Sequence, residues 1–358
     1  MKKILYIVNC GFLPDEKGII NKINQEKWSF EKAGYEVKIY NINKSDLFFN
    51  ELEVINKGRI KKTFKVVNNI MEFVQREKPD FIYIRDILYY FNLYPRLSKI
   101  APVFVEIQTN ILEEFKLYNK KRYFVENYFK RSYFKNISAF ICITKEIYKN
   151  ESQYNKKQGF ILGNGIDVSE IEFVPLKKEN NKINLIFIGS HQLPWHGVER
   201  LLDSFLKAEN KDKFQLHIVG YENILGEEHE DIKFYGFIKD KKSMEEVFAR
   251  CDIGIGTMSL YKKNMNEAAP LKTRHYLAKG LPVVIGYEDV DIDDQLPFVL
   301  RVANDSSLLD FKSIERFYQG TKELRLDKTI TEYALNNISW EKKVKKLSEF
   351  MEGFEVLQ

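Results

Sequence analysis

The chain has 358 residues, of which 44% are hydrophobic and 30% charged, a composition typical of a folded globular protein and not of a disordered one. No run of eighteen apolar residues is present, which excludes a transmembrane helix of the usual length. The net charge of +5 is uneven: residues 1–170 carry 29 basic and 20 acidic side chains, and residues 171–358 carry 27 and 31. The basic first half is compatible with an anionic partner such as nucleic acid, anionic lipid or an anionic substrate.

The cysteines and the first residues favour a cytoplasmic setting. Cys10, Cys142 and Cys251 are far apart, odd in number and without metal-ligand spacing, so we expect neither a disulfide framework nor a structural zinc site. The chain opens with two lysines and a short apolar run, and no small-residue cleavage site follows. This pattern predicts a first strand rather than a secretion signal.

In the first half, short apolar runs alternate with amphipathic segments. Gly34 follows the helical pattern Ile20–Lys32, where a C-terminal cap glycine belongs, and a second helical pattern covers Lys62–Gln75. Alternation of strands and helices favours a parallel sheet. The predicted strands are Ile4–Val8, Glu36–Tyr40, Phe81–Ile84, Val103–Ile107 and Ala139–Ile143.

The pattern restarts after a polar linker at 175–182. Two consecutive units of similar size predict an α/β fold of two Rossmann-like domains, whose parallel sheets face a central cleft and bind ligands at the carboxyl ends of their strands. The predicted strands are Ile183–Ile188, Gln215–Val219, Ile232–Tyr235, Ile253–Ile255 and Pro282–Ile285, and the predicted helices are Val198–Ala208, Ser243–Arg250 and Leu271–Lys279.

The stretch 266–285 combines an acidic residue with a helix start. Pro270 suits the first turn of the predicted helix, and Gly280 suits its C-terminal cap. The free N–H groups near Ala269–Lys272 would form an anion site to which Lys272 adds a charge, with Glu267 just before it. An ordinary strand-connecting helix is the alternative interpretation.

The stretch 187–202 has the order strand, glycine loop, helix. Gly189 and Gly197 allow the loop between them to approach a phosphate closely, and this loop contains His191 and His196. All five histidines of the chain lie in the second half, which favours a site shared with His275. We expect no metal there, because no cysteine or aspartate completes a ligand spacing.

On these residues the chain resembles a GT-B-fold glycosyltransferase and is most similar to glycosyltransferase family 4. The family signature is a glutamate, seven residues, a second glutamate and then Gly-x-Pro-Val-Val. Glu267 takes the first position, His275 replaces the second glutamate, and the signature ends on Gly280-Leu-Pro-Val-Val284. Other landmarks, in order, are Asn164-Gly-Ile-Asp167, Trp195-His-Gly-Val198, Cys251-Asp-Ile253 and Ser339-Trp340-Glu341.

The resemblance implies three parts of the chain. Residues 1–168 correspond to an N-terminal acceptor-binding domain and residues 169–338 to a C-terminal domain that binds the nucleotide sugar. Residues 339–358 correspond to a terminal helix that crosses back to the first domain.

The resemblance also implies residue roles. Glu267 would contact hydroxyls of the donor sugar and, with Lys272, is the expected catalytic residue. The family's cationic pair corresponds to Ser190 and His196, which carry no permanent charge, so Lys272 and Arg274 are the nearest substitutes. The expected donor-binding residues are Gly18, Gly189, His191, His196, Gly197, Ala269, Pro270, Leu271, Arg274 and His275.

Two positions in the first half are expected on the acceptor side. Gln108 and Asn110 follow the strand Val103–Ile107, where the family places residues near the reacting sugar. Arg85 and Asp86 follow the preceding strand, and a buried structural ion pair is an equally good interpretation of them.

Residues 115–135 are the most basic and aromatic segment, with seven lysines and arginines, one glutamate and eight aromatic residues. One interpretation is a long helix with a buried aromatic stripe and a solvated basic face. The other is an interfacial helix that binds anionic lipid and brings the enzyme to a lipid-linked acceptor. Nucleic acid is not expected as a partner.

The resulting prediction is a retaining hexosyltransferase that acts on a glycan or lipid-linked acceptor. It would use a nucleotide-sugar donor and no metal or cofactor, in the synthesis of bacterial surface polysaccharide or glycoconjugates. It would lie in the cytoplasm or peripherally on the inner face of the membrane. The alternative is a family member that binds the nucleotide sugar without transfer and serves as a partner or scaffold.

Two classes outside this family fit the sequence poorly. A dinucleotide oxidoreductase would need Gly-x-Gly-x-x-Gly after the first strand, where only Gly11 and Gly18 occur. A periplasmic binding protein would need an export signal, which the first residues do not resemble.

Overall fold

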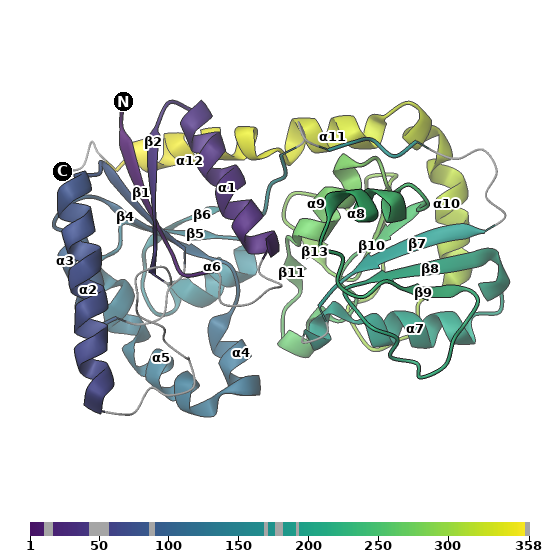
Figure 1. The fold of residues 1–358 in the computed structure, drawn as a ribbon, viewed down its shortest axis with the longest axis horizontal. Helices are drawn as coiled ribbons and strands as arrows, with labels where there is room; N and C mark the ends of the chain where they lie inside the picture. Colours follow the sequence, from purple (N-terminus) through teal and green to yellow (C-terminus); the bar gives the residue numbers. More distant parts are fainter. Residues whose placement is uncertain are drawn as a thin grey trace. The chain divides into compact units, whose positions relative to one another are not determined.

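The structure is a computed structural model that describes residues 1–10, 17–42, 57–85, 90–167, 171–175, 182–190 and 193–354. The chain divides into two compact units (Figure 1). Unit 1 comprises Met1–Gly163 and Trp340–Gln358, and unit 2 comprises Asn164–Ser339.

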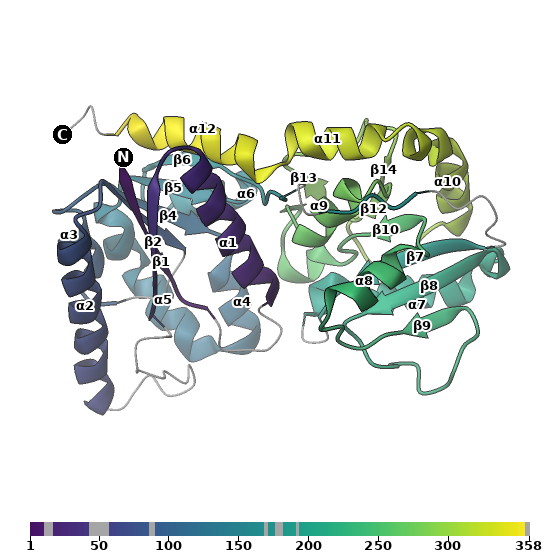
Figure 2. The same ribbon diagram turned by 45° about the horizontal axis from the view of Figure 1, so that its top comes forward.

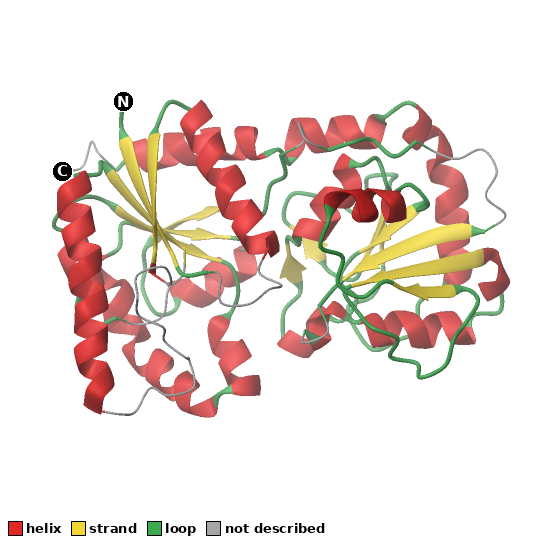
Figure 3. Cartoon of the chain, viewed as in Figure 1, coloured by secondary structure: helices red, strands yellow, loops and turns green. Residues whose placement is uncertain are grey.

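Unit 1 is built on a six-stranded sheet in the order β2-β1-β3-β4-β5-β6, with every pair of neighbours parallel (Figure 3). The strands are β1 (Lys3–Val8), β2 (Glu36–Asn41), β3 (Phe81–Arg85), β4 (Val103–Ile107), β5 (Ala139–Cys142) and β6 (Gln158–Ile161). The helices are α1 (Lys17–Lys32), α2 (Lys57–Glu77), α3 (Leu93–Leu97), α4 (Ile111–Tyr118), α5 (Lys120–Tyr133), α6 (Lys145–Ser152) and α12 (Trp340–Glu352).

One face of this sheet is covered by the first and last helices of the chain. Tyr6 of β1 lies opposite Tyr83 of β3, and both belong to a buried cluster that includes Ile23 and Phe30 of α1. Helix α12 lies beside α1 in both views (Figures 1 and 2) and adds Trp340, Val344, Leu347 and Met351 to the same cluster. The burial of these side chains holds the C-terminal helix on unit 1.

Unit 2 contains a second six-stranded parallel sheet, in the order β14-β12-β10-β7-β8-β9. Its strands are β7 (Ile183–Ile188), β8 (Phe214–Val219), β9 (Ile232–Phe234), β10 (Ile253–Ile255), β12 (Val283–Ile285) and β14 (Val299–Arg301), and β11 (Glu267–Ala268) pairs separately with β13 (Glu288–Asp289). Its helices are α7 (Val198–Lys207), α8 (Lys241–Phe248), α9 (Leu271–Ala278), α10 (Phe311–Leu326) and α11 (Thr329–Asn337).

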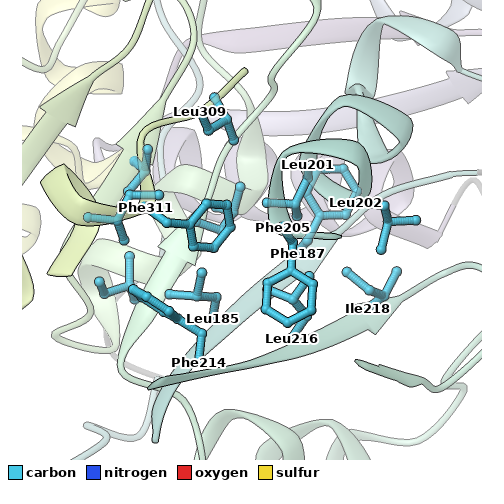
Figure 4. Close-up of a cluster of buried hydrophobic side chains, with 14 of the residues drawn as sticks. Leu185, Phe187, Leu201, Leu202, Phe205, Phe214, Leu216, Ile218, Leu309 and Phe311 are labelled. Carbon is cyan, nitrogen blue, oxygen red and sulfur yellow. The ribbon is translucent and has the colours of Figure 1, made fainter. Parts of the chain in front are cut away.

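The core of unit 2 joins α7 and the start of α10 to the sheet. Figure 4 shows Leu201, Leu202 and Phe205 of α7 packed near side chains of β7 and β8. Phe311 makes edge-on ring contacts with Phe205 at 5.7 Å and with Phe214 at 5.1 Å. These contacts fix α7 against the sheet.

The predicted α/β fold with two parallel sheets is confirmed, and every predicted strand is present with its ends within one residue. The sequence did not reveal β6 and β14, each of which is the last strand of its sheet. Edge strands are partly exposed, and β6 has no buried residue, so neither shows the continuous apolar run of a central strand.

The predicted long helix at 115–135 is wrong, because Asn119 adopts a non-helical conformation and caps the following helix α5 through the amide of Arg122. Among the described residues, no helix has the length and apolar character needed to cross a membrane.

Candidate functional site

The candidate site of unit 2 lies at the carboxyl ends of β7 and β10. β7 pairs with β8 on one side and with β10 on the other, so the strand order reverses at this point. In open α/β sheets, ligands bind outside the carboxyl ends of the strands at such a switch point. The loops after β7 and β10 and the first turn of α9 all reach this edge.

Gly189 and Ser190, directly after β7, are held by several contacts. The Ser190 carbonyl accepts a hydrogen bond from the Tyr221 hydroxyl at 2.8 Å, and the Ser190 amide donates to Nδ1 of His196 at 3.0 Å. A Cβ at Gly189 would lie 2.7 Å from the Tyr221 ring, so only glycine fits there. These contacts fix Ser190, and the predicted glycine at 189 is required for packing.

His196 is a neutral side chain in this loop. Burial and the nearby charges of Lys272 and Lys263 hold its pKa well below the usual value of 6.5. Because Nδ1 accepts from the Ser190 amide, Nε2 carries the proton. His196 can therefore offer one neutral hydrogen-bond donor, but not a cation, to a ligand.

The loops after β7 and β10 are joined to each other. The amide of Met258 donates to the His196 carbonyl at 3.0 Å, and the amide of Ser259 donates to the Trp195 carbonyl at 3.2 Å. Gly197 has a φ of +77°, and a Cβ there would lie 2.6 Å from the Ser259 hydroxyl. The predicted glycine at 197 thus permits the close approach of the two loops.

In the described part of the chain, the first turn of α9 presents free amides. Pro270 is the residue before the helix rather than within its first turn, a shift of one position from the prediction, and no side chain caps this end. The amides of Leu271, Lys272 and Thr273 have no carbonyl partner within the helix. A helix start of this kind attracts anions. Ala269, directly before Pro270, is buried.

Lys272 adds a titratable cation at this edge of the sheet. Its Nζ donates to the Ile188 carbonyl at the end of β7 at 2.9 Å and lies 4.2 Å from the ring centroid of Phe187. Burial lowers the pKa of Lys272 to about 7. Its ammonium is thus close to the loop in which the resemblance places a cationic pair.

Arg274 does not have the predicted role. Its guanidinium is completely buried and donates to the Asn164 carbonyl at 2.9 Å, to Asp289 at 2.6 Å and to Asp291 at 2.6 Å. Two carboxylates balance the charge of Arg274. Because the side chain is also buried, it has no surface exposed to a donor diphosphate. The predicted donor contact of Arg274 is therefore corrected to a structural role that fixes α9.

His275 packs against an aromatic ring. It stacks on Phe248 of α8, with ring centroids 5.1 Å apart and planes inclined by 20°. Burial, together with the charges of Lys279 and Lys241, lowers the pKa of His275 to about 3. The side chain that replaces the family's second glutamate is therefore neutral.

Glu267 lies on β11, opposite Glu288 of β13, and is partly exposed. The segment after it is held by Asn164, whose Nδ2 donates to the Ala269 carbonyl at 2.7 Å. In the sequence, Asn164 is only the first residue of the family landmark Asn164-Gly-Ile-Asp167. Its separation of 105 residues from Ala269 left no local signal for this contact.

Lys263 is a further residue that sequence reasoning missed. It is buried, its Nζ lies 4.4 Å from the ring centroid of Trp195, and its charge acts on His196. The loop after β7 is thus flanked by two lysines from distant parts of the sequence. A sequence window around the loop contains neither of them.

In unit 1, the acceptor-side candidates follow β4. Asn110 precedes α4, and Gln108 has a buried Nε2 without a hydrogen-bond partner in the part of the chain that is described. Gly18 is exposed in the first turn of α1. Arg85 lies 3.9 Å from Glu106, so its ion pair is with β4. Asp86 and His191 lie outside the described residues.

A buried polar cluster under α1 was not predicted. Lys22 pairs with Glu106 at 2.7 Å and lies 3.5 Å from Glu26, while the Tyr6 hydroxyl donates to Glu26 at 2.7 Å. Burial and the Glu106 charge raise the pKa of Glu26 to about 8. A helical pattern in sequence does not show that charged side chains from α1 and β4 will meet inside the unit.

Comparisons with known proteins bear on the fold and on part of unit 2. Residues 182–305 match the family model described as glycosyl transferases group 1. No curated protein matches the chain significantly. Among solved structures, a glycosyltransferase from Rickettsia africae is similar over 100% of this chain and 99% of its own, at 14% identity and a TM-score of 0.67.

Two further structures show the same fold at lower identity. The catalytic domain of starch synthase IV from Arabidopsis thaliana, bound to ADP and acarbose, covers 98% of each chain at 10% identity and a TM-score of 0.61. TarM covers 98% of this chain and 99% of its own, at 10% identity and a TM-score of 0.64. These likenesses establish the fold.

The chain therefore has the GT-B fold, and residues 182–305 of unit 2 match a group 1 glycosyltransferase domain, as the motifs predicted. The class of protein that the fold and this domain support is a glycosyltransferase. No group of three or more histidine, cysteine or acidic side chains suited to a metal is found in the described parts of the chain.

Proposed function

We propose that the protein is a retaining glycosyltransferase of family 4 that transfers a hexose from a nucleotide-sugar donor to a glycan or lipid-linked acceptor. The observation that carries this proposal is the start of α9, which has no side-chain cap. Its first turn contains Lys272, whose Nζ lies at the carboxyl end of β7. Backbone amides and a lysine at the switch point of a group 1 glycosyltransferase domain suit a diphosphate. Starch synthase IV, which shares the fold, was solved with ADP.

In this proposal the charge that develops on the leaving diphosphate is stabilised without a metal ion. The amides of Leu271, Lys272 and Thr273, the Lys272 ammonium and the Nε2–H of His196 would donate to its oxygens. Lys263 would add a second positive charge near the loop. Donors fixed before the reaction stabilise such charge more effectively than mobile water does.

Retention follows if the acceptor hydroxyl attacks from the face that the diphosphate leaves. A diphosphate oxygen then accepts the hydroxyl proton, so no strong protein base is needed. Glu267 would accept hydrogen bonds from donor-sugar hydroxyls and orient the ring. The biological role that fits is the assembly of bacterial surface polysaccharide or glycoconjugates, at the cytoplasmic face of the membrane.

The first test is the substitution Glu267→Gln. With the natural donor, found by a thermal-shift panel of nucleoside diphosphates and nucleotide sugars, we expect kcat/KM to fall by about 10²-fold or more while the melting temperature is unchanged. The matched control is Glu288→Gln, because Glu288 lies opposite Glu267 on β13 and is exposed. Transfer by Glu267→Gln at the parental rate would show that the sugar site is elsewhere.

A second candidate is a nucleotide-sugar-binding protein without transfer activity. It is favoured by one observation, namely that Ser190 and the neutral His196 stand where the family has a cationic pair. Binding of a nucleotide sugar without release of nucleoside diphosphate, in the presence of an acceptor panel, would support this candidate over the first.

A further inference from the structure

One side of helix α5 carries buried charged side chains. Its inward side carries ion pairs: Arg122 with Glu126 at 2.9 Å, and Lys130 with Glu151 of α6 at 2.7 Å. The side chains of Lys130 and Glu151 are nearly completely buried. The Lys130–Glu151 pair links α5 to α6, whereas Arg122 and Glu126 pair within α5.

The outward side of α5 carries large aromatic rings. Phe124 is 69% exposed and Tyr128 is 80% exposed, the highest values among the large hydrophobic residues of the described chain after Met1. The two rings are four residues apart, so they share one helix face, and Lys121 lies one turn before them. The aromatic stripe formed by Phe124 and Tyr128 is therefore exposed.

Two cations border these rings. Lys120 and Lys121 are exposed at the start of α5, and neither takes part in an ion pair within the described part of the chain. We call Lys120, Lys121, Phe124 and Tyr128 the α5 face. Aromatic rings favour the boundary between water and acyl chains, and each lysine near an anionic bilayer adds to its attraction.

We propose that the α5 face binds the surface of a membrane that contains anionic lipid. A second copy of the chain is a poorer occupant, because two such faces would bring four lysines together. If the protein is the glycosyltransferase proposed above, this contact delivers it to an acceptor carried in the bilayer. Membrane binding itself does not depend on that activity.

The test is cosedimentation of the full chain with vesicles of phosphatidylcholine and phosphatidylglycerol in a 70:30 ratio, compared with phosphatidylcholine alone. We expect binding to the anionic vesicles only. Lys120→Glu/Lys121→Glu should weaken it at least tenfold, and Phe124→Ser/Tyr128→Ser several-fold. All four side chains are exposed, so both variants should keep the parental melting temperature.

Matched controls separate the α5 face from general charge and hydrophobicity. Lys345→Glu/Lys346→Glu reverses an exposed lysine pair on α12 of the same unit, and Leu326→Ser removes a side chain that is 63% exposed. Both should bind like the parent. Arg122 is left unchanged because its pair with Glu126 supports the helix.

Three outcomes would overturn the proposal. The parent could fail to bind the anionic vesicles, or both α5-face variants could bind as the parent does. Light scattering could instead show a dimer that Phe124→Ser/Tyr128→Ser dissociates, which would make the face a self-interface. A thermal shift with nucleoside diphosphates, measured on the same variants, reports the donor site separately, so failure of one proposal is distinguishable from failure of the other.

Discussion

Lys272 is the residue whose chemistry can be tested most directly. With a pKa of about 7 it changes charge within the range of ordinary assays. An anionic ligand binds the ammonium form, so affinity for a nucleoside diphosphate should fall as the pH rises above about 7, by up to about tenfold per pH unit. Calorimetric titration with UDP, ADP and GDP from pH 6 to pH 9 measures this dependence.

The variant Lys272→Met should show both consequences of removing the charge. Nucleoside diphosphate binding should weaken, and its pH dependence above pH 7 should be lost. The ligand-free variant should melt at a higher temperature than the parent at pH 7, because the parent keeps a desolvated lysine that ionises more readily in the unfolded chain. Equal affinity of variant and parent at every pH would remove Lys272 from the diphosphate site.

Helix α9 shows what the sequence could and could not predict at the scale of an element. Its start, its length and the cap glycine Gly280, which has a φ of +80°, follow from local signals. Its inner contacts do not. Arg274 was assigned to the donor because it is a cation near an anion site, yet its partners Asp289 and Asp291 follow 15 and 17 residues later, in a segment without periodicity.

The network around Arg274 makes α9 dependent on a buried charge. Arg274→Met would leave Asp289 buried without a counter-charge, and we expect unit 2 to lose about 3–5 kcal/mol of unfolding free energy. The control is Arg301→Met, because Arg301 pairs with Asp294 and Glu288 at the surface and should contribute about 1 kcal/mol or less. Urea unfolding with hydrogen exchange of α9 measures both, and equal losses would contradict the structural role of Arg274.

For the whole molecule, the fold was predictable because apolar runs of strand length and helix-period segments alternate twice along the chain. The two buried polar systems were not, because each is assembled from residues that are distant in sequence. Glu26 meets Tyr6 and Glu106 in unit 1, and His217 of unit 2 bonds Tyr235 at 2.8 Å and Asn184 at 2.9 Å. From these shifts we expect the two units to respond to pH in opposite ways.

Unit 1 should lose stability as the pH rises from about 4.5 to about 8, because unfolded Glu26 ionises over this range while buried Glu26 stays protonated. Unit 2 should lose stability as the pH falls below 6.5, because burial and nearby cations lower the pKa of His217 to about 4 and that of His275 to about 3. Each of these groups changes the free energy of unfolding by at most about 1.4 kcal/mol per pH unit.

Hydrogen exchange at pH 5 and pH 8, corrected for intrinsic rates, should therefore show better protection of β1 and β4 at pH 5 and of β8 and β10 at pH 8. Glu26→Gln should abolish the first difference and His217→Gln should reduce the second, whereas parallel changes in both units would refute this origin of the pH response.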